Sequence, residues 1–262
     1  MGDSYKKEMT VSGHLEELRR VLIVSIAAVV VFAAGAYVFS PQVMDILLSP
    51  ITSAGHQPVV TAVTEAFMTR IKLSLFMGFL AGLPIILWQV WSFVSPALEG
   101  TERRYCFLFV FGSFFLFLGG VAFGFFGVYK YAVAFLLKFA GDQLVPMLTI
   151  DKYISFTIYL LIPFGVIFQL PLASFLLARL GLISSAFLAK NRRYALFGTV
   201  VLAAAITPTP DIITCLMMTG PMYGLYEVSV LIVRFTERAL ARKKAREEAE
   251  EAEASKPAAN RV

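Results

Sequence analysis

The stretch that decides the fold is VLIVSIAAVVVFAAGAYVF, residues 21–39, in which nineteen residues pass without a charged side chain. A helix needs about 20 such residues to cross a hydrocarbon core about 30 Å thick. Five further apolar runs follow it, at residues 71–94, 107–128, 154–177, 195–206 and 212–233. We therefore predict an all-α integral membrane protein with six transmembrane helices.

The composition of the whole chain supports this class. It is 58% hydrophobic and 16% charged, with a mean hydropathy of +0.74, whereas soluble domains carry about 25% charged residues. Outer-membrane barrels alternate apolar and polar residues, but here the apolar runs are continuous. A soluble domain and a membrane barrel are both excluded, which leaves helices to pair the backbone groups within lipid.

The last two apolar runs are short. Residues 195–206 would span only about 18 Å as a helix, and Glu227 interrupts the sixth run. A short turn, TPTPD at residues 207–211, joins them. The pair is either re-entrant or a hairpin in a locally thinned bilayer, and the small cost of thinning favours the hairpin. We expect kinked helices and a curved bundle, because prolines occur inside the runs: Pro84, Pro163, Pro171 and Pro221.

The basic residues predict the orientation. If the N-terminus is cytoplasmic, eighteen of the 23 Lys and Arg residues fall on the cytoplasmic side, as the positive-inside rule requires. Both termini are therefore expected in the cytoplasm. The polar first 20 residues do not resemble a signal peptide, so the first span is expected to remain as an anchor. We predict one transmembrane domain over residues 1–235 and a charged cytoplasmic tail over 236–262, helical at first and then disordered.

Two acidic segments lie on the predicted cytoplasmic side. HLEELR at residues 14–19 precedes the first span, and FVSPALEGTERR at residues 93–104 links the second span to the third. Each has a structural explanation, an amphipathic lead-in for Glu17 and a helix-start acid for Glu102. Neither explanation accounts for both acids on one surface. Two carboxylates suit a ligand with adjacent arginines, whose guanidinium groups stay charged and bind carboxylates in a fork geometry.

Few other residues could carry chemistry. The two histidines, His14 and His56, lie outside the spans, which leaves an intramembrane serine protease without a base. The chain also lacks a phosphate-binding glycine loop, so we predict no enzyme and no cofactor. Gln169 and Glu227 are polar residues within spans, where such groups face a partner helix or a cavity. A small-solute secondary transporter and a membrane scaffold remain as alternatives.

Residues 12–235 resemble the TatC family, the receptor subunit of the twin-arginine protein translocase. The resemblance rests on the order and spacing of several motifs. They are HLEELR at 14–19, Pro50, QVWSF at 89–93 with PAL at 96–98 and ERR at 102–104, Phe164 with Phe168 and Pro171, TPTPD at 207–211, and PMY at 221–223 with Tyr226 and Glu227.

The resemblance implies a receptor in the cytoplasmic (inner) membrane that binds twin-arginine signal peptides of folded proteins. Transport would be driven by the proton-motive force, with small single-span partners of the TatA and TatB types. Implied signal-peptide-binding residues are Glu17, Glu102, Phe93, Pro96, Leu98 and Arg19. Implied outer-loop residues needed for transport are Pro50, Glu65 and Phe67. Implied partner-docking residues are Gln169, Thr207, Pro221, Tyr226 and Glu227. The chain departs from many relatives at Gln169, where they carry Glu, and at Cys215, where they carry Gln.

Overall fold

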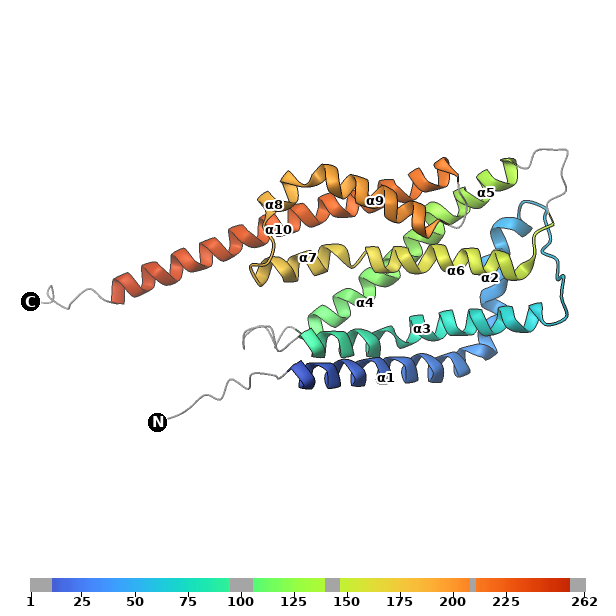
Figure 1. Cartoon of the computed structure of the whole chain (residues 1–262), viewed down its shortest axis with the longest axis horizontal. Coiled ribbons are helices and arrows are strands. Elements are labelled where there is room, and N and C mark those ends of the chain that lie inside the picture. The colour runs from blue at the N-terminus through green and yellow to red at the C-terminus, as the bar shows by residue number, and fades with distance from the viewer. Residues whose placement is uncertain (1–10, 95–105, 140–146, 208–210, 255–262) are drawn as a thin grey trace, which may run out of the picture. The chain divides into compact units, whose positions relative to one another are not determined.

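The computed structural model describes residues 11–94, 106–139, 147–207 and 211–254. The chain divides into two compact units, Met1–Gly165 and Val166–Val262, whose helices are labelled in Figure 1. The described residues are helical apart from their connections and one isolated parallel bridge between Val59 and Thr149. The predicted all-α class is therefore confirmed.

Unit 1 begins with three connected helical segments and ends near the last turn of α6. Its elements are α1 (Val11–Ala36), the 3-10 turn η1 (Tyr37–Phe39), α2 (Ser40–Thr52), α3 (Glu65–Val94), α4 (Cys106–Phe123), the π-helical turn η4 (Gly124–Tyr129), α5 (Lys130–Phe139) and α6 (Ile150–Ile167). The third apolar run was expected to end at residue 128, but the helix continues through η4 and α5. Ala132 and Val133 in this extension are buried, and α5 packs against α2.

Helices α1 and α3 pack closely because glycine lets their backbones approach. A Cβ on Gly78 would lie 2.5 Å from the backbone nitrogen of Ala33, so no side chain fits there. One turn later, a Cβ on Gly82 would lie 3.7 Å from the carbonyl carbon of Ala28. Residue numbers rise along α3 as they fall along α1, so the two helices are antiparallel, as Figure 1 shows.

A buried tyrosine pair connects α2, η4 and α6. The hydroxyls of Tyr129 and Tyr153 both donate to the Leu47 carbonyl, at 3.1 and 3.3 Å. The Thr157 hydroxyl lies 2.9 Å from the Tyr129 hydroxyl. The Leu47 carbonyl oxygen therefore accepts two hydrogen bonds, which attach α2 to both η4 and α6.

Unit 2 contains α7 (Leu170–Arg179), α8 (Ser185–Lys190), α9 (Arg192–Ile206) and α10 (Ile212–Ala254), and the first three all pack against α10. The single span expected at residues 154–177 is divided between α6 and α7. Pro171 lies in the first turn of α7, where its missing N–H is tolerated, whereas inside one helix it would remove the bond to the Ile167 carbonyl.

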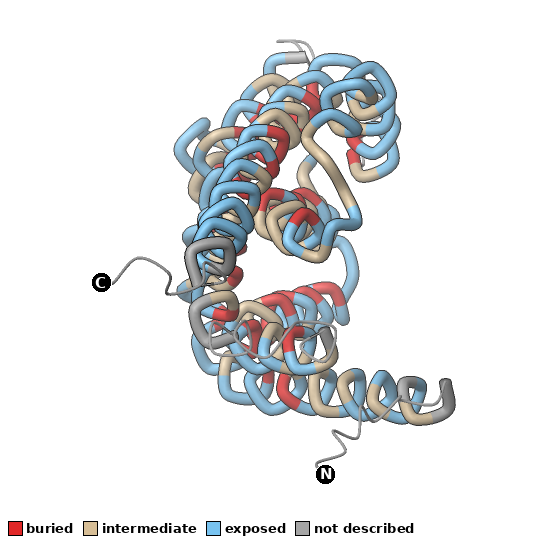
Figure 2. Tube along the Cα trace, turned by 90° about the vertical axis from the view of Figure 1, so that its left-hand side faces the viewer, coloured by how far each residue is buried: buried red, intermediate tan, exposed pale blue. Residues whose placement is uncertain are grey.

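Five helical segments are long and apolar enough to cross a membrane: Leu15–Thr52, Glu65–Phe93, Phe109–Lys138, Ile150–Arg179 and Ile212–Glu250. Helix α9, the predicted fifth span, has only 15 residues. Between 6% and 33% of each apolar window is buried, and exposed positions follow most helices in Figure 2. Val31, Phe115 and Phe197 are each more than 60% exposed. Apolar surface of this extent suits contact with lipid rather than water.

Candidate functional site

The antiparallel register of α1 and α3 brings two predicted site residues together. Gly78 of α3 lies opposite Ala33 of α1. When this pairing is followed along both helices, Phe93 at the end of α3 lies beside Glu17 and Leu18 of α1. Figure 1 shows the start of α1 next to the end of α3. A residue from the first acidic segment therefore lies beside the start of the second.

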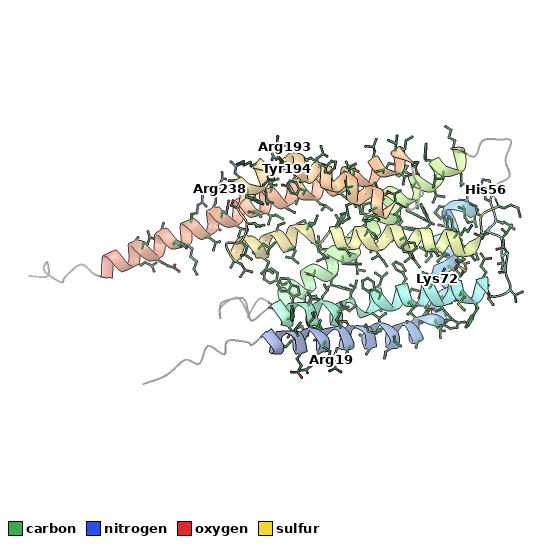
Figure 3. The ribbon with its side chains drawn as sticks, in the orientation of Figure 1. Arg19, His56, Lys72, Arg193, Tyr194 and Arg238 are labelled. Atoms are coloured by element: carbon green, nitrogen blue, oxygen red, sulfur yellow. The ribbon has the colours of Figure 1, made fainter. Side chains whose placement is uncertain are left out.

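The Glu17 carboxylate is only partly solvated. One of its oxygens, Oε2, is buried and has no hydrogen-bond partner among the residues that the structure describes, whereas its neighbour Glu16 is exposed. A buried carboxylate oxygen without a donor is costly, so this position favours a cationic or hydrogen-bonding ligand. Arg19 is exposed on the same stretch of α1, and Figure 3 shows it towards that end of the helix.

The end of α3 is held in place by α4. The Trp91 indole stacks on Phe109 with 4.6 Å between ring centroids, and its Nε1 donates to the Ser113 hydroxyl at 3.3 Å. Trp91 and Ser113 are both buried. Phe93, two residues later, is half-buried. These contacts between α3 and α4 fix the orientation of the end of α3 about its helix axis, next to Glu17.

Three of the predicted signal-peptide-binding residues, Pro96, Leu98 and Glu102, lie outside the described residues. They belong to residues 95–105, between Val94 at the end of α3 and Cys106 at the start of α4. The structure thus brings Glu17 and Phe93 together, with Arg19 nearby. The positions of the other three remain predictions.

Glu65 lies at the opposite end of unit 1 and joins three segments. Its Oε2 accepts from the Thr61 backbone N–H at 2.6 Å, the Thr61 hydroxyl at 2.8 Å and the Ala62 N–H at 3.3 Å. Its Oε1 accepts from the Asp151 N–H at 3.1 Å. Glu65 therefore connects the loop before α3 to the first turn of α6.

Asp151 and Lys72 complete this end of unit 1 and were missed in the sequence. Lys72 Nζ lies 2.6 Å from Asp151 Oδ1 and 3.1 Å from the Ser155 hydroxyl, and Figure 3 shows Lys72 towards this end of α3. Backbone bonds run from Val59 N to Leu148 O and from Ile150 N to Val59 O. The sequence carried no signal for these pairings, because they join residues about 80 to 90 positions apart.

The other two predicted outer-loop residues behave differently from Glu65. Pro50 lies inside α2, near its last turn. Phe67 is in the first turn of α3 and is 54% exposed. Only Glu65 of the three has a clear role in holding the loops together, and the exposed Phe67 ring is available to lipid or to another protein.

In unit 2, Glu227 is an internally paired acid. Its Oε2 lies 2.8 Å from the Arg192 guanidinium, and its Oε1 accepts from the Tyr223 hydroxyl at 2.9 Å. Tyr226, at the preceding position, donates its hydroxyl to the Leu188 carbonyl at 2.7 Å. Both residues therefore attach α10 to the start of α9 and the end of α8. Arg193 and Tyr194 lie in the same region of unit 2 (Figure 3).

Thr207 attaches the other end of α9 to α10. Its buried hydroxyl donates to the Ala203 carbonyl at 2.5 Å and lies 3.3 Å from the Met218 sulfur.

Gln169 lies in the two-residue turn before α7, and its backbone N–H donates to the Val166 carbonyl at 2.9 Å. Pro221 is inside α10, which remains one helix of 43 residues. The predicted docking residues are therefore distributed over α9, α10 and the turn before α7.

A second acid of α10 holds the start of α8. Glu237 accepts from both the backbone N–H and the hydroxyl of Ser185, while Ser184 caps the same helix through the Phe187 N–H at 3.1 Å. Among the residues that the structure describes, no three His, Cys, Asp or Glu side chains are grouped so that they could hold a metal ion.

Residues 13–221 match the model of the family described as Sec-independent protein translocase protein (TatC). The chain is 47% identical over 229 residues to the Sec-independent protein translocase protein TatC of Carboxydothermus hydrogenoformans, covering 87% of this chain and 94% of that protein. It is 40% identical to the TatC protein of Desulforapulum autotrophicum, covering 84% and 83%. It is 35% identical to the chloroplastic TATC protein of Arabidopsis thaliana, covering 88% and 68%.

The fold is also similar to a crystal structure of the twin-arginine translocase receptor TatC. The TM-score is 0.77 at 35% sequence identity, covering 86% of this chain and 99% of that one. A second crystal structure of that receptor, in the detergent DDM, gives a TM-score of 0.76 at 36% identity. With the family model, the relatives and the fold in agreement, this multi-pass membrane chain belongs to the TatC family of Sec-independent protein translocase proteins.

Proposed function

We propose that this chain is the receptor subunit of a twin-arginine translocase and binds the Arg-Arg signal peptide of folded proteins. The observation that carries the proposal is the buried, unpartnered Oε2 of Glu17 beside Phe93. The family is a transport component rather than an enzyme, and membership in it argues against the small-solute transporter considered above.

The recognition surface in this proposal consists of Glu17, Arg19 and Phe93 together with Pro96, Leu98 and Glu102. Glu17 and Glu102 would each take one guanidinium of the arginine pair. Phe93, with Pro96 and Leu98, would contact the apolar part of the signal peptide. Arginine is favoured over lysine, because its planar fork can bond a carboxylate through two N–H groups at once.

A binding assay with a matched control tests this proposal. The purified full chain is titrated with a fluorescent Arg-Arg signal peptide and with the Lys-Lys version. Glu17→Gln should weaken Arg-Arg binding by about 10- to 150-fold, the equivalent of about 1.5–3 kcal/mol for a hydrogen bond to a charged group. Glu16→Gln, an equal charge change at an exposed neighbour, should leave the affinity unchanged. Equal losses in both variants would reject the site.

We further propose six membrane spans with both termini in the cytoplasm, in the inner membrane, and residues 236–262 as a cytoplasmic tail. Five segments satisfy the length of a span, and α9 would cross a thinned region as the sixth, since its 15 residues reach about 22 Å. Single cysteines placed at two exposed loop positions, Ala54 after α2 and Leu182 after α7, should be labelled from opposite sides of the membrane. Labelling of both from the same side would reject this topology.

Unit 2 is the proposed docking region for single-span partners of the TatA and TatB types. Its predicted residues are Gln169, Thr207, Pro221, Tyr226 and Glu227. The outward face of α9 supports this role, because Phe197 is 70% and Val201 51% exposed. We propose that Pro50, Glu65 and Phe67 support transport at the outer surface, with Glu65 acting as a positioning residue for the loops.

A further inference from the structure

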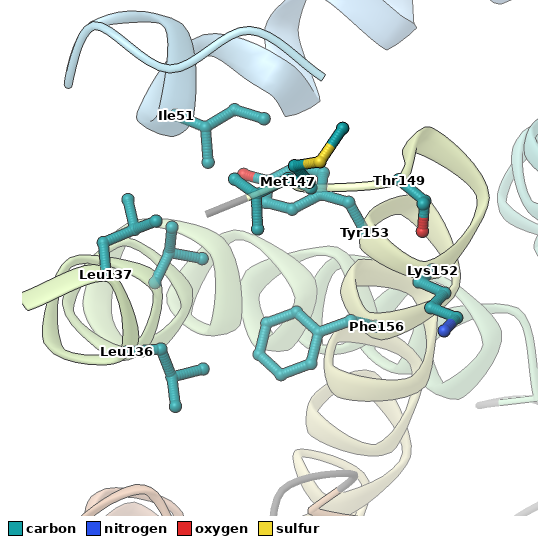
Figure 4. Close-up of a pocket in the computed structure, with 10 residues that line it drawn as sticks. Ile51, Leu136, Leu137, Met147, Thr149, Lys152, Tyr153 and Phe156 are labelled. Carbon is teal, nitrogen blue, oxygen red and sulfur yellow. The ribbon is translucent and has the colours of Figure 1, made fainter. Parts of the chain in front are cut away.

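Unit 1 contains an apolar cavity that the recognition surface does not use. Its volume is about 320 Å³, within the range of small-molecule sites. The walls come from α2, α5, the start of α6 and the residues before it (Figure 4). Ile51, Leu136, Tyr153 and Phe156 are among the apolar side chains that line it. The cavity lies at the end of unit 1 away from Glu17.

Two polar groups at this cavity have no partner within the described ranges. Lys152 lines it and makes no ion pair with any residue that the structure describes. Thr149 also lines it, and its hydroxyl oxygen is buried with no hydrogen-bond partner in the described part of the chain. Two other lysines of unit 1 offer a contrast, because Lys72 pairs with Asp151 and Lys130 lies over the rings of Phe125 and Phe126. Lys138 also makes no ion pair with a described residue, but it is exposed on α5 and does not line the cavity.

We propose that this cavity binds an anionic phospholipid, with part of one acyl chain among the apolar side chains and the phosphate on Lys152 and Thr149. An ammonium beside a cavity between membrane helices suits an anionic headgroup, and the Thr149 hydroxyl can donate to a phosphate oxygen. A soluble anion would leave the apolar walls uncovered. An inserted peptide would bring backbone N–H and C=O groups that the walls could not pair.

The position of the cavity fits a lipid of the outer leaflet. Lys152 and Tyr153 lie in the first turn of α6, and lysine and tyrosine are the side chains that anchor helix ends at a membrane interface. Under the proposed topology this end of unit 1 is the outer surface. The bound lipid would support the α2–α6 packing that the tyrosine pair maintains.

Photocrosslinking tests this site directly. The full chain is reconstituted with phosphatidylglycerol that carries a diazirine in one acyl chain, or with the matching phosphatidylcholine, and the lipid attached to residues 147–156 is measured by mass spectrometry. We expect phosphatidylglycerol to label this segment about fivefold more, the factor that about 1 kcal/mol per lysine gives at 25 °C. Lys152→Gln should reduce the ratio to about one.

Three comparisons decide the outcome. Lys130→Gln removes the same charge from a lysine that does not line the cavity, and it should leave the ratio unchanged. Leu136→Trp should lower labelling by both lipids, because the larger side chain fills the cavity. Free glycerol 3-phosphate should not compete, since it has no acyl chain. Equal labelling by the two lipids in the wild type, or an unchanged ratio in Lys152→Gln, would overturn the proposal.

Discussion

The α1–α3 contact is expected to control both stability and signal-peptide binding, and Gly78→Ala tests this. The new Cβ would lie 2.5 Å from the Ala33 nitrogen and 2.6 Å from its Cα, so α1 must move away from α3. Overpacking of this kind costs about 1–3 kcal/mol, and the better helix propensity of Ala returns about 0.5–1 kcal/mol. The net destabilisation should be up to about 2.5 kcal/mol.

Two glycines provide graded controls for this variant. A Cβ on Gly82 would lie 3.6 Å from the nearest atom of Phe32, an ordinary contact, and a Cβ on Gly35 would meet nothing within 4 Å. Unfolding in SDS, followed by circular dichroism, should rank Gly78→Ala as least stable and Gly35→Ala as at least as stable as the wild type. Only Gly78→Ala should also weaken Arg-Arg peptide binding, because it displaces Glu17 from Phe93. Equal stability of the Gly78→Ala and Gly35→Ala variants would refute the packing argument.

Three other variants separate structure from function. Ser113→Ala should cost about 1–3 kcal/mol of stability, because it leaves the buried Trp91 N–H without its hydroxyl acceptor. Trp91→Phe should then cost much less stability in the Ser113→Ala protein than in the wild type. Thr207→Val should lower the unfolding midpoint while Thr207→Ser does not, since only the serine keeps the hydroxyl bond to α9; equal effects would exclude that bond as the cause. Glu227→Gln should change stability by less than about 1 kcal/mol, because its pair with Arg192 is partly exposed, yet it should reduce co-purification of a TatB-type partner if the docking proposal is right.

The sequence predicted the helical membrane class, because nothing but helices can pair the backbone over long apolar runs. It also placed Pro171 within a span, but a local pattern cannot distinguish a kink from a break between α6 and α7. The third apolar span was expected at residues 107–128, and the helix that contains it continues through η4 and α5 to Phe139. Lys130 and Lys138, in the extension through α5, are typical of a loop, whereas the inner face of α5 is buried against the protein.

The candidate site was only partly predictable. Glu17 and Phe93 could be chosen as acid and apolar contact, but their proximity depends on the Gly78 contact between α1 and α3, which no local pattern encodes. Glu65 was expected as an outer-loop residue, but its bond to the Asp151 N–H joins residues 86 positions apart. Pairings between residues so far apart in the sequence are set by tertiary packing. Sequence patterns can therefore predict which residues are important but not which residues they contact.

A double-mutant cycle between Glu17 and the signal peptide tests the central claim most directly. Peptide affinity is measured for the wild type and Glu17→Gln, each with the Arg-Arg peptide and with a peptide in which one arginine is glutamine, taking each arginine in turn. We predict a coupling energy of about 1.5–3 kcal/mol with one of the two arginines, as for a charge-assisted contact. Coupling below about 0.5 kcal/mol with both arginines would mean that the effects are additive and would contradict recognition of the arginine pair by Glu17.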